Sequence, residues 1–362
     1  MHRSYVVGMR NGSALALLLG AALLIGSEVR ADEPAAVVGK NSKVELSGVG
    51  WAVYRYRLED ADTTNVARDY NSFDLDRVYF SAAYAVDERM KWVTTLEANN
   101  KAGVLDLFLK KAYLQVKDPF HWAGSTLWLG QFDHQFVVPQ EKIWGLRSVS
   151  KVGLDDYFGV ASTHVGAGVG STVANGQLDW ALTIGNERPY NKESTHKYKT
   201  GLARVTVTPA AAGAAQHFHL LAGLQVNADK PKASDNQNTL IMLFPHWQSD
   251  DLMIGLEFDR MQDKHVVGGT GGTPIKKLTT DSQLLGVMAS ARVTERLRLF
   301  GRVESYDPNT DGKKDALTRA IAGVARSYGK NVRGIVDLDL RSTERSGDDS
   351  DMTLSARAEV TL

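Results

Sequence analysis

The sequence predicts an all-β protein, a transmembrane antiparallel β-barrel of about 16 strands. Three observations lead to this prediction. Apolar and polar residues alternate along most of the chain, most alternating segments are 10–14 residues long, and short turns alternate with longer polar connections. A strand that crosses a bilayer at a tilt needs about 9–11 residues, whereas strands of soluble sheets average about 5–6.

The C-terminal segment, residues 352–362, shows the alternation most clearly, because its even-numbered positions are apolar and its odd-numbered positions polar. A period of two gives a strand one apolar and one polar face. The same pattern predicts sixteen strands: 43–58, 72–86, 90–99, 106–117, 125–133, 157–172, 177–187, 198–208, 216–228, 238–248, 251–261, 280–293, 296–306, 316–327, 331–343 and 351–362.

Composition excludes several other classes. The 362 residues are 43% hydrophobic and 23% charged, which is too apolar for a disordered chain. Because there is no cysteine, the chain has no disulfide framework, thiolate metal site or cysteine nucleophile. Basic and acidic residues both number 42, so the balance gives no reason to expect a nucleic-acid partner. A mean hydropathy of −0.24 argues against a bundle of membrane-spanning helices.

The first 31 residues have the features of a secretory signal peptide. Arg3 and Arg10 give a basic start, residues 13–26 form a short apolar run, and Val29 and Ala31 provide the small side chains of a cleavage site. The alternative is a membrane anchor, which the shortness of the run disfavours. We therefore expect a signal peptide over 1–31, a periplasmic segment over 32–42 and a barrel over 43–362.

The connections favour a barrel in a bacterial outer membrane. Short turns near residues 87–89, 174–176, 249–250, 294–295 and 327–329 alternate with longer polar loops. This rhythm, an even strand count and both termini on the short-turn side are typical of outer-membrane barrels. The alternative is a large secreted β-sandwich or propeller, but strand length, turn rhythm and the absence of a blade-length repeat favour the barrel.

Two segments resemble a known family. Residues 73–98 (FDLDRVYFSAAYAVDERMKWVTTLEA) and 129–140 (LGQFDHQFVVPQ) are similar to strands of the phosphate-selective porin O and P family. The resemblance implies a 16-stranded homotrimer in the outer membrane that passes small solutes. One departure is the C-terminal residue, Leu362, because such barrels usually end in Phe or Trp.

The longest connection, residues 134–156, is the candidate constriction loop. In the porins that the chain resembles, the loop at this place folds into the barrel and narrows the pore. Here it carries the charged residues Glu141, Lys142, Arg147, Lys151, Asp155 and Asp156. The alternative is an external loop that packs on the rim.

The polar faces of the strands would line the pore and set its selectivity. The first four strands place on this face Arg55, Arg57, Arg77, Lys91, Lys111 and Lys117, against Glu45 and Glu97. Later strands add Arg302, Arg333 and Arg357, among others. One hypothesis is a basic wall with a modest anion preference; the other is that these cations pair with neighbouring acids and only stiffen the barrel.

Other candidate sites are weaker. The spacing of Asp307, Asn309, Asp311 and Asp315 matches the start of a calcium loop, but the twelfth position is Thr318 instead of a glutamate. A polar surface turn is the preferred interpretation. No arrangement predicts a catalytic site, and no cofactor is expected.

Together these patterns predict a porin that lets small hydrophilic solutes, with anions such as phosphate as candidates, diffuse passively through the outer membrane. The alternative is a non-conducting structural or partner-binding barrel. Outer-membrane lipid and further copies of the chain are the expected partners.

Overall fold

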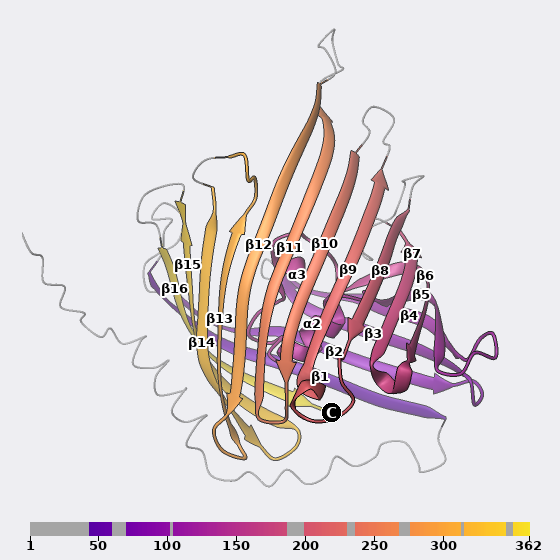
Figure 1. Ribbon diagram of the computed structural model, residues 1–362. Coiled ribbons are helices and arrows are strands. Elements are labelled where there is room, and N and C mark those ends of the chain that lie inside the picture. Colours follow the sequence, from indigo (N-terminus) through magenta and orange to yellow (C-terminus); the bar gives the residue numbers. More distant parts are fainter. Residues whose placement is uncertain are drawn as a thin grey trace, which may run out of the picture.

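The chain forms a closed antiparallel β-barrel of 16 strands (Figure 1). The structure, a computed structural model, describes residues 43–59, 70–101, 104–186, 199–229, 236–267, 276–312, 315–344 and 350–362. The predicted signal peptide and the segment 32–42 lie outside the described residues. No helix in these ranges is long and apolar enough to cross a bilayer.

Each strand pairs with its neighbours in sequence, and β1 pairs with β16 to close the barrel. The strands are β1 (Val44–Glu59), β2 (Asn71–Ala85), β3 (Met90–Lys101), β4 (Val104–Lys117), β5 (Ser125–Asp133), β6 (Thr163–Val173), β7 (Leu178–Gly185), β8 (Thr200–Val207), β9 (Phe218–Asp229), β10 (Asn236–Gln248), β11 (Leu252–Val267), β12 (Lys276–Arg292), β13 (Leu297–Asp307), β14 (Leu317–Tyr328), β15 (Val332–Thr343) and β16 (Ser350–Thr361). The helices are α2 (Val137–Trp144), α3 (Gly153–Asp156) and the 3₁₀ turns η1 (Ala174–Gly176) and η2 (Ala214–His217).

All sixteen predicted strands are present, and three boundary predictions were wrong. β11 extends to Val267 instead of ending at residue 261, and β12 begins at Lys276 instead of residue 280. β6 begins at Thr163 instead of residue 157. The six residues before it, 157–162, belong to the preceding connection, which therefore runs from 134 to 162 and contains α2 and α3. Tyr157 and Phe158 give this stretch the apolar character of a strand, but their rings pack on Tyr306 of β13 inside the barrel.

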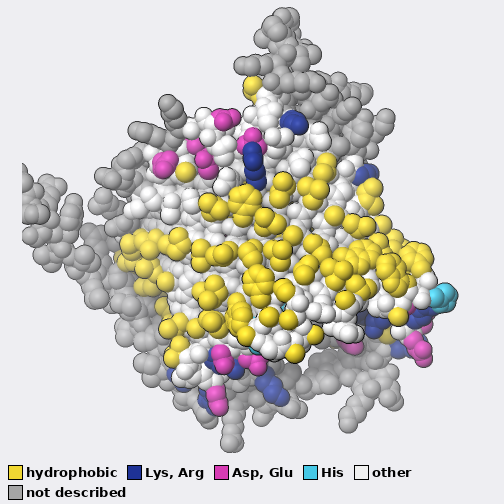
Figure 2. All heavy atoms as spheres, viewed as in Figure 1, with side chains coloured by type: hydrophobic (Ala, Val, Ile, Leu, Met, Phe, Trp, Pro, Cys, Tyr) yellow, Lys and Arg dark blue, Asp and Glu magenta, His cyan; other side chains and the backbone are white. Residues whose placement is uncertain are grey.

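The outer wall is apolar at mid-height, as a lipid-facing surface must be. Figure 2 shows hydrophobic side chains as a band across the strands, with charged side chains above and below it. Large side chains exposed on the wall include Leu182, Ile184, Leu224, Ile241, Ile254, Leu256, Leu285, Val287, Leu299 and Val303. In water such a surface would be a strong aggregation hazard, so the exposed band disfavours the soluble sandwich.

Two of the three register shifts in β1–β4 change the inner wall near the loop; the third, at Leu58, lies at the end of β1. The register shifts at Asp76 and again at Lys110. At a bulge one strand has an extra residue, which changes the side to which the following side chains point. Asp76 and Arg77 therefore both face the interior, as do Lys110 and Lys111, and the inner wall gains charged residues that strict alternation would place outside.

We predict that Leu256→Arg destabilises the barrel by about 2–4 kcal/mol, because the guanidinium would face the middle of the bilayer. Leu256→Ala is the control that removes the same apolar side chain without adding a charge. The measurement is the free energy of unfolding in urea from lipid vesicles. Equal losses for the two variants would show that this face does not contact lipid.

Candidate constriction site

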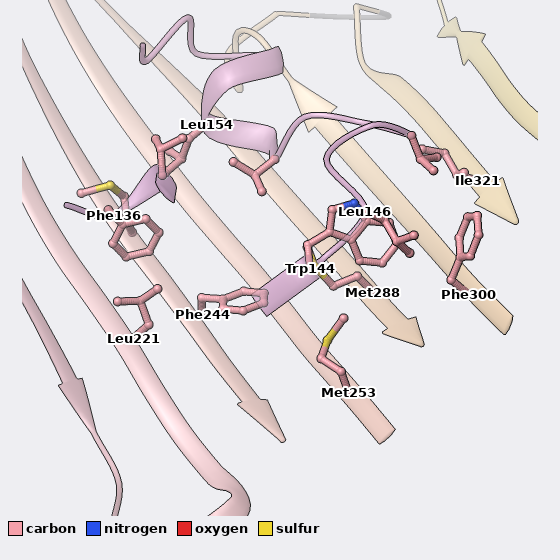
Figure 3. Packing of buried hydrophobic residues seen from close by; sticks show 14 of the residues in the cluster. Phe136, Trp144, Leu146, Leu154, Leu221, Phe244, Met253, Met288, Phe300 and Ile321 are labelled. Atoms are coloured by element: carbon pink, nitrogen blue, oxygen red, sulfur yellow. The ribbon is translucent and has the colours of Figure 1, made fainter. Parts of the chain in front are cut away.

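The connection 134–162, here called the inward loop, lies inside the barrel. Its residues Phe136, Val137, Trp144, Leu146, Val152 and Leu154 are at most 1% exposed. They pack on inward-facing apolar residues of β8–β15, among them Leu221, Phe244, Met288, Phe300 and Ile321 (Figure 3). Each large apolar side chain buried in this way stabilises the docked loop by about 1.5–3 kcal/mol. The loop is thus a packed part of the core.

Two glycines allow the loop and the wall to come this close. A Cβ atom on Gly153 of α3 would lie 2.0 Å from Leu284 Cδ2 of β12. A Cβ atom on Gly223 of β9 would lie 2.8 Å from the ring of Phe136. Since real contacts are never that short, a side chain at either position would push the loop away from the wall.

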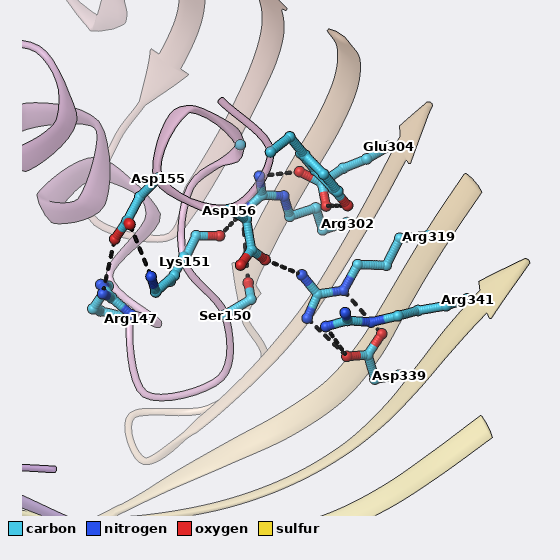
Figure 4. Close-up of polar contacts among 12 residues, drawn as sticks. Arg147, Ser150, Lys151, Asp155, Asp156, Arg302, Glu304, Arg319, Asp339 and Arg341 are labelled. Atoms are coloured by element: carbon cyan, nitrogen blue, oxygen red, sulfur yellow. Dashed lines mark hydrogen bonds and ion pairs between the residues drawn. The ribbon is translucent and has the colours of Figure 1, made fainter. Parts of the chain in front are cut away.

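Four arginines, one from each of the consecutive strands β13–β16, bind residues 145–156 of the loop. The contacts are Arg302 Nη1 to the Lys151 carbonyl (2.6 Å), Arg319 Nη1 to the Asp156 carboxylate (2.7 Å), Arg333 Nη2 to the Gly145 carbonyl (2.9 Å) and Arg357 Nη1 to the Ser148 carbonyl (2.8 Å). Two of these guanidiniums, those of Arg302 and Arg319, are drawn in Figure 4. We call the four residues the arginine row.

Each arginine of the row also pairs with a carboxylate of the wall. Arg319 pairs with Asp339, Arg333 with Glu359 and Arg357 with Asp337. Arg302 pairs with both Glu257 and Glu304. A guanidinium has five N–H donors in a planar fork, so it can bind a carboxylate and a loop carbonyl at the same time. The row therefore joins the loop to the wall through fixed, charge-assisted hydrogen bonds.

The Arg302 cluster is the most deeply buried part of this network. The side chains of Arg302, Glu257 and Glu304 are all 0% exposed. The loop adds two donors: the Gly153 amide bonds Glu257 at 3.2 Å and the Tyr157 hydroxyl bonds Glu304 at 3.1 Å. Burial and the charge of Glu304 raise the pKa of Tyr157, so its hydroxyl stays protonated and keeps donating.

His134 fastens the start of the loop. Its Nδ1 accepts hydrogen bonds from the amides of Phe136 and Val137, both at 3.2 Å, in the first turn of α2. Nδ1 must therefore be unprotonated, and the ring proton lies on Nε2, which donates to Gln225 Oε1 at 2.9 Å. Burial lowers the pKa of His134 to about 4, and the bond to Gln225 opposes the shift only in part. The ring is neutral at pH 7.

The opposite side of the loop carries charge and faces β1–β5. Arg147 binds Glu141 and Asp155, and Lys151 binds Asp155 at 2.8 Å. The Arg147 guanidinium lies 5.9 Å from the Trp51 ring centroid, as does that of Arg77 on the wall. Burial raises the pKa of Glu141, while Arg147 and Lys110 of β4 lower it. The charges of the loop and of this wall are therefore close enough to interact.

Four cations of this wall have carboxylate partners. Arg55 binds Asp74 and Asp76 at 3.0 and 2.8 Å. Glu97 binds Arg77 at 3.1 Å and Lys110 at 2.8 Å, and Lys111 binds Asp133 at 2.6 Å. Pairing reduces the electrostatic field that these charges produce in the interior of the barrel.

The predicted pore-lining residues fall at different heights. Arg77, Glu97 and Lys111 lie together at mid-height, next to the loop. Arg55 and Arg57 lie nearer the long-loop end of β1, and Lys91 follows the short turn into β3 at the other end. On the loop, Glu141, Arg147 and Lys151 belong to the charged side, while Lys142 of α2 is exposed.

Sequence reasoning missed Lys110, Asp74, Asp76 and Asp133. The adjacent charged pairs Asp76–Arg77 and Lys110–Lys111 were the available signal, because two neighbouring polar residues in an alternating strand indicate a bulge. It also counted Arg302, Arg333 and Arg357 as pore-lining, whereas their guanidiniums bind loop carbonyls.

The calcium-like sequence forms a polar turn after β13. Asp307 Oδ1 accepts a hydrogen bond from the Asn309 amide, and Asn309 Oδ1 accepts one from the Asp311 amide. Asp315 lies beyond residues 313–314, which are not described. Among the described residues no group of three or more His, Asp or Glu side chains is placed to hold a metal ion.

Comparison with solved structures decides the fold family. An anion-selective porin from Comamonas acidovorans superposes with a TM-score of 0.65 and 11% identity over 88% of this chain and 99% of that one. The chain has the fold of outer-membrane porins. The porin fold is shared with the channel DcaP of Acinetobacter baumannii (TM-score 0.62, 13% identity, 88% and 97% covered) and the trimer form of OmpT, an outer-membrane protein of Vibrio cholerae (TM-score 0.56, 14% identity, 88% and 99% covered). No family model and no curated protein matches the sequence.

We predict that Arg302→Met loosens the inward loop, because it leaves the Glu257 and Glu304 carboxylates buried without their cation, at a cost of about 3–5 kcal/mol. The chain has no cysteine, so Ser148→Cys, at a buried loop position whose hydroxyl has no hydrogen-bond partner among the described residues, provides a clean probe. Its reaction with a maleimide in the folded protein should be faster with Arg302→Met than without it. Arg292→Met, at the exposed end of β12, is the control, and equal protection in all three backgrounds would contradict the anchoring role.

We predict that lowering the pH towards 4 destabilises the protein, because His134 is buried as a neutral ring. Its folded pKa of about 4 lies below the value of about 6.5 in an unfolded chain. The stabilisation is therefore complete above pH 6.5 and is lost as the pH falls towards 4, by up to about 3 kcal/mol. The measurement is the free energy of unfolding of the wild type and of His134→Gln between pH 7 and 4. The wild type should lose more, and parallel curves would refute the assignment.

Proposed function

We propose that the protein is a porin that lets small hydrophilic solutes cross the outer membrane passively, with a modest preference for anions such as phosphate, and that it has no enzymatic activity. The observation that carries the proposal is the unequal access of water to the two sides of the inward loop. On the β1–β5 side of the loop Arg55 is 31%, Lys111 23% and Lys151 34% exposed, although Lys110 and Glu97 there are only 8% and 1% exposed. Arg302, on the other side, is 0% exposed.

A hydrated passage along β1–β5 follows from this asymmetry. The loop is packed against β8–β15, so the remaining lumen lies between its charged side and the charged wall of β1–β5. Solutes would be selected there by size and, weakly, by charge. The preference for anions is supported by the structurally similar protein that is described as an anion-selective porin.

We propose in addition that the protein assembles as a homotrimer. The sequence resemblance implies this state, and one neighbouring structure is described as a trimer form. A trimer would give each functional unit three parallel pores.

The test is conductance of the purified protein in planar bilayers. We expect discrete channels that close in three equal steps, and a small reversal potential of the anion-selective sign in a KCl gradient. Lys111→Gln should shift that potential towards cations, because it leaves Asp133 without its partner in the passage. Lys330→Gln, in an exposed turn, should not shift it.

Each part of the proposal has its own contrary result. Folded barrels that never conduct would favour a structural or partner-binding barrel. Wild-type channels that prefer cations would contradict the anion preference but would still agree with the porin function.

A further inference from the structure

The outer wall has a basic surface where β13 and β14 meet their short turns. Arg326, near the end of β14, and Arg296, in the turn between β12 and β13, line one hollow of this surface together with Thr294, Glu295 and Leu297. Figure 2 shows charged side chains at this end of the barrel, below the apolar band. We call Arg296 and Arg326 the rim arginines. They are separate from the arginine row, whose side chains point into the barrel.

The direction of Arg326 follows from the alternation of β14. Ile321 and Ala325 face the interior and are both 3% exposed, so the side chain of Arg326 points to the outside. Its neighbours across the sheet are Leu297 on β13 and Gly334 on β15. Because glycine has no side chain, β15 presents none at the position next to Arg326. The guanidinium is therefore on the lipid side of the wall.

The height of Arg326 is that of the membrane surface. One outward position deeper, Val324 pairs with Leu299 of β13, which is 49% exposed in the apolar band. One position nearer the turn is Tyr328, whose ring centroid lies 5.3 Å from Arg326 Cζ. Successive outward positions of a strand are about 7 Å apart, and tyrosine is typical of the membrane–water interface. Arg326 therefore lies where the hydrocarbon ends and the phosphate groups of phospholipids begin.

The turns identify the leaflet. The rim arginines belong to the end of the barrel at which β12 and β13, and also β14 and β15, are joined by short turns. In outer-membrane barrels the short turns face the periplasm. The lipid next to Arg326 is therefore one of the periplasmic leaflet.

The charge of this surface is positive. Within residues 294–297 and 326–330 the charged side chains are Arg296, Arg326 and Lys330 against Glu295. In the described part of the chain the Arg326 guanidinium has its ring contact with Tyr328 and no carboxylate partner. A guanidinium stays charged at any ordinary pH, and its planar fork matches the oxygens of a phosphate group. An anion from the membrane would balance this charge.

We propose that the rim arginines bind the phosphate group of an anionic phospholipid of the periplasmic leaflet, with its acyl chains against Leu297, Leu299 and Val324. A zwitterionic lipid carries a cation in its headgroup, which the positive surface would repel, so the site favours a lipid with net negative charge. The site lies outside the barrel, goes beyond conduction and does not depend on it.

The test is native mass spectrometry of the full-length protein in detergent, titrated with phosphatidylglycerol or with phosphatidylcholine of the same acyl chains. We expect saturable binding of phosphatidylglycerol, about five- to tenfold tighter than that of phosphatidylcholine, because the two headgroups differ by one positive charge. Equal affinities would overturn the site, since Arg326 would then only extend its charged head to the water at the interface.

Three variants test the location. Arg326→Gln should weaken the binding of phosphatidylglycerol about three- to tenfold and leave that of phosphatidylcholine unchanged. Arg326→Lys keeps the charge and should keep most of the affinity. Glu295→Gln should act in the opposite direction and strengthen the binding of phosphatidylglycerol. Arg260→Gln is the matched control, because Arg260 is 52% exposed and pairs with Asp281 towards the long-loop end of β11.

The contrary results are distinct. Unchanged binding of phosphatidylglycerol with Arg326→Gln, or an equal loss with Arg260→Gln, would overturn the location. Weaker binding with Glu295→Gln would overturn the electrostatic basis. These positions are at the surface, so each variant should unfold in urea as the wild type does, and a loss of lipid binding is then not a loss of folding.

Lipid binding is measured without a current, so its failure is distinct from a failure to conduct. A barrel that conducts ions but does not distinguish the two lipids would retain the porin proposal alone. A barrel that prefers phosphatidylglycerol but does not conduct would retain the lipid site alone.

Discussion

The arginine row of β13–β16 is the constraint on which the interior of this barrel depends. A sixteen-stranded barrel is wide enough to enclose a water-filled lumen, so a loop inside it needs strong attachments to keep one position. Arg302, Arg319, Arg333 and Arg357 provide them, since each guanidinium binds the loop and a wall carboxylate at once. Breaking the pair at Arg302 or at Arg357 would leave a buried charge without compensation, and the loop is therefore held at one place.

Apolar packing completes the attachment on the adjacent strands. Inward-facing residues of β8–β14 such as Leu221, Phe244 and Met288 would be unfavourable in a water-filled lumen, but the loop covers them. At these positions the wall is apolar on both faces, outside against lipid and inside against the loop. The loop thus separates a packed region against β8–β15 from the charged wall of β1–β5.

The charges on the inner wall of β1–β5 are arranged as pairs, so their total number does not give the net electrostatic field. Arg77 and Lys110 share Glu97, and Lys111 binds Asp133. A count of basic residues on the inner face suggests a strong positive field, whereas the paired arrangement gives a weak one. These cations therefore have acidic partners close by, and the anion preference inferred from the sequence stays a prediction.

The sequence by itself determined the barrel, its strand number and nearly all strand boundaries, because a period of two is a local property that each strand records separately. Tertiary structure alone decided the contents of the lumen. Alternation cannot place Asp76 or Lys110, since a bulge depends on the register with the neighbouring strand. It cannot distinguish an arginine that lines water from one that binds a loop carbonyl, as Arg302 and Arg357 do. Those roles depend on contacts between residues some 150–210 positions apart, and a local pattern carries no record of such distant partners.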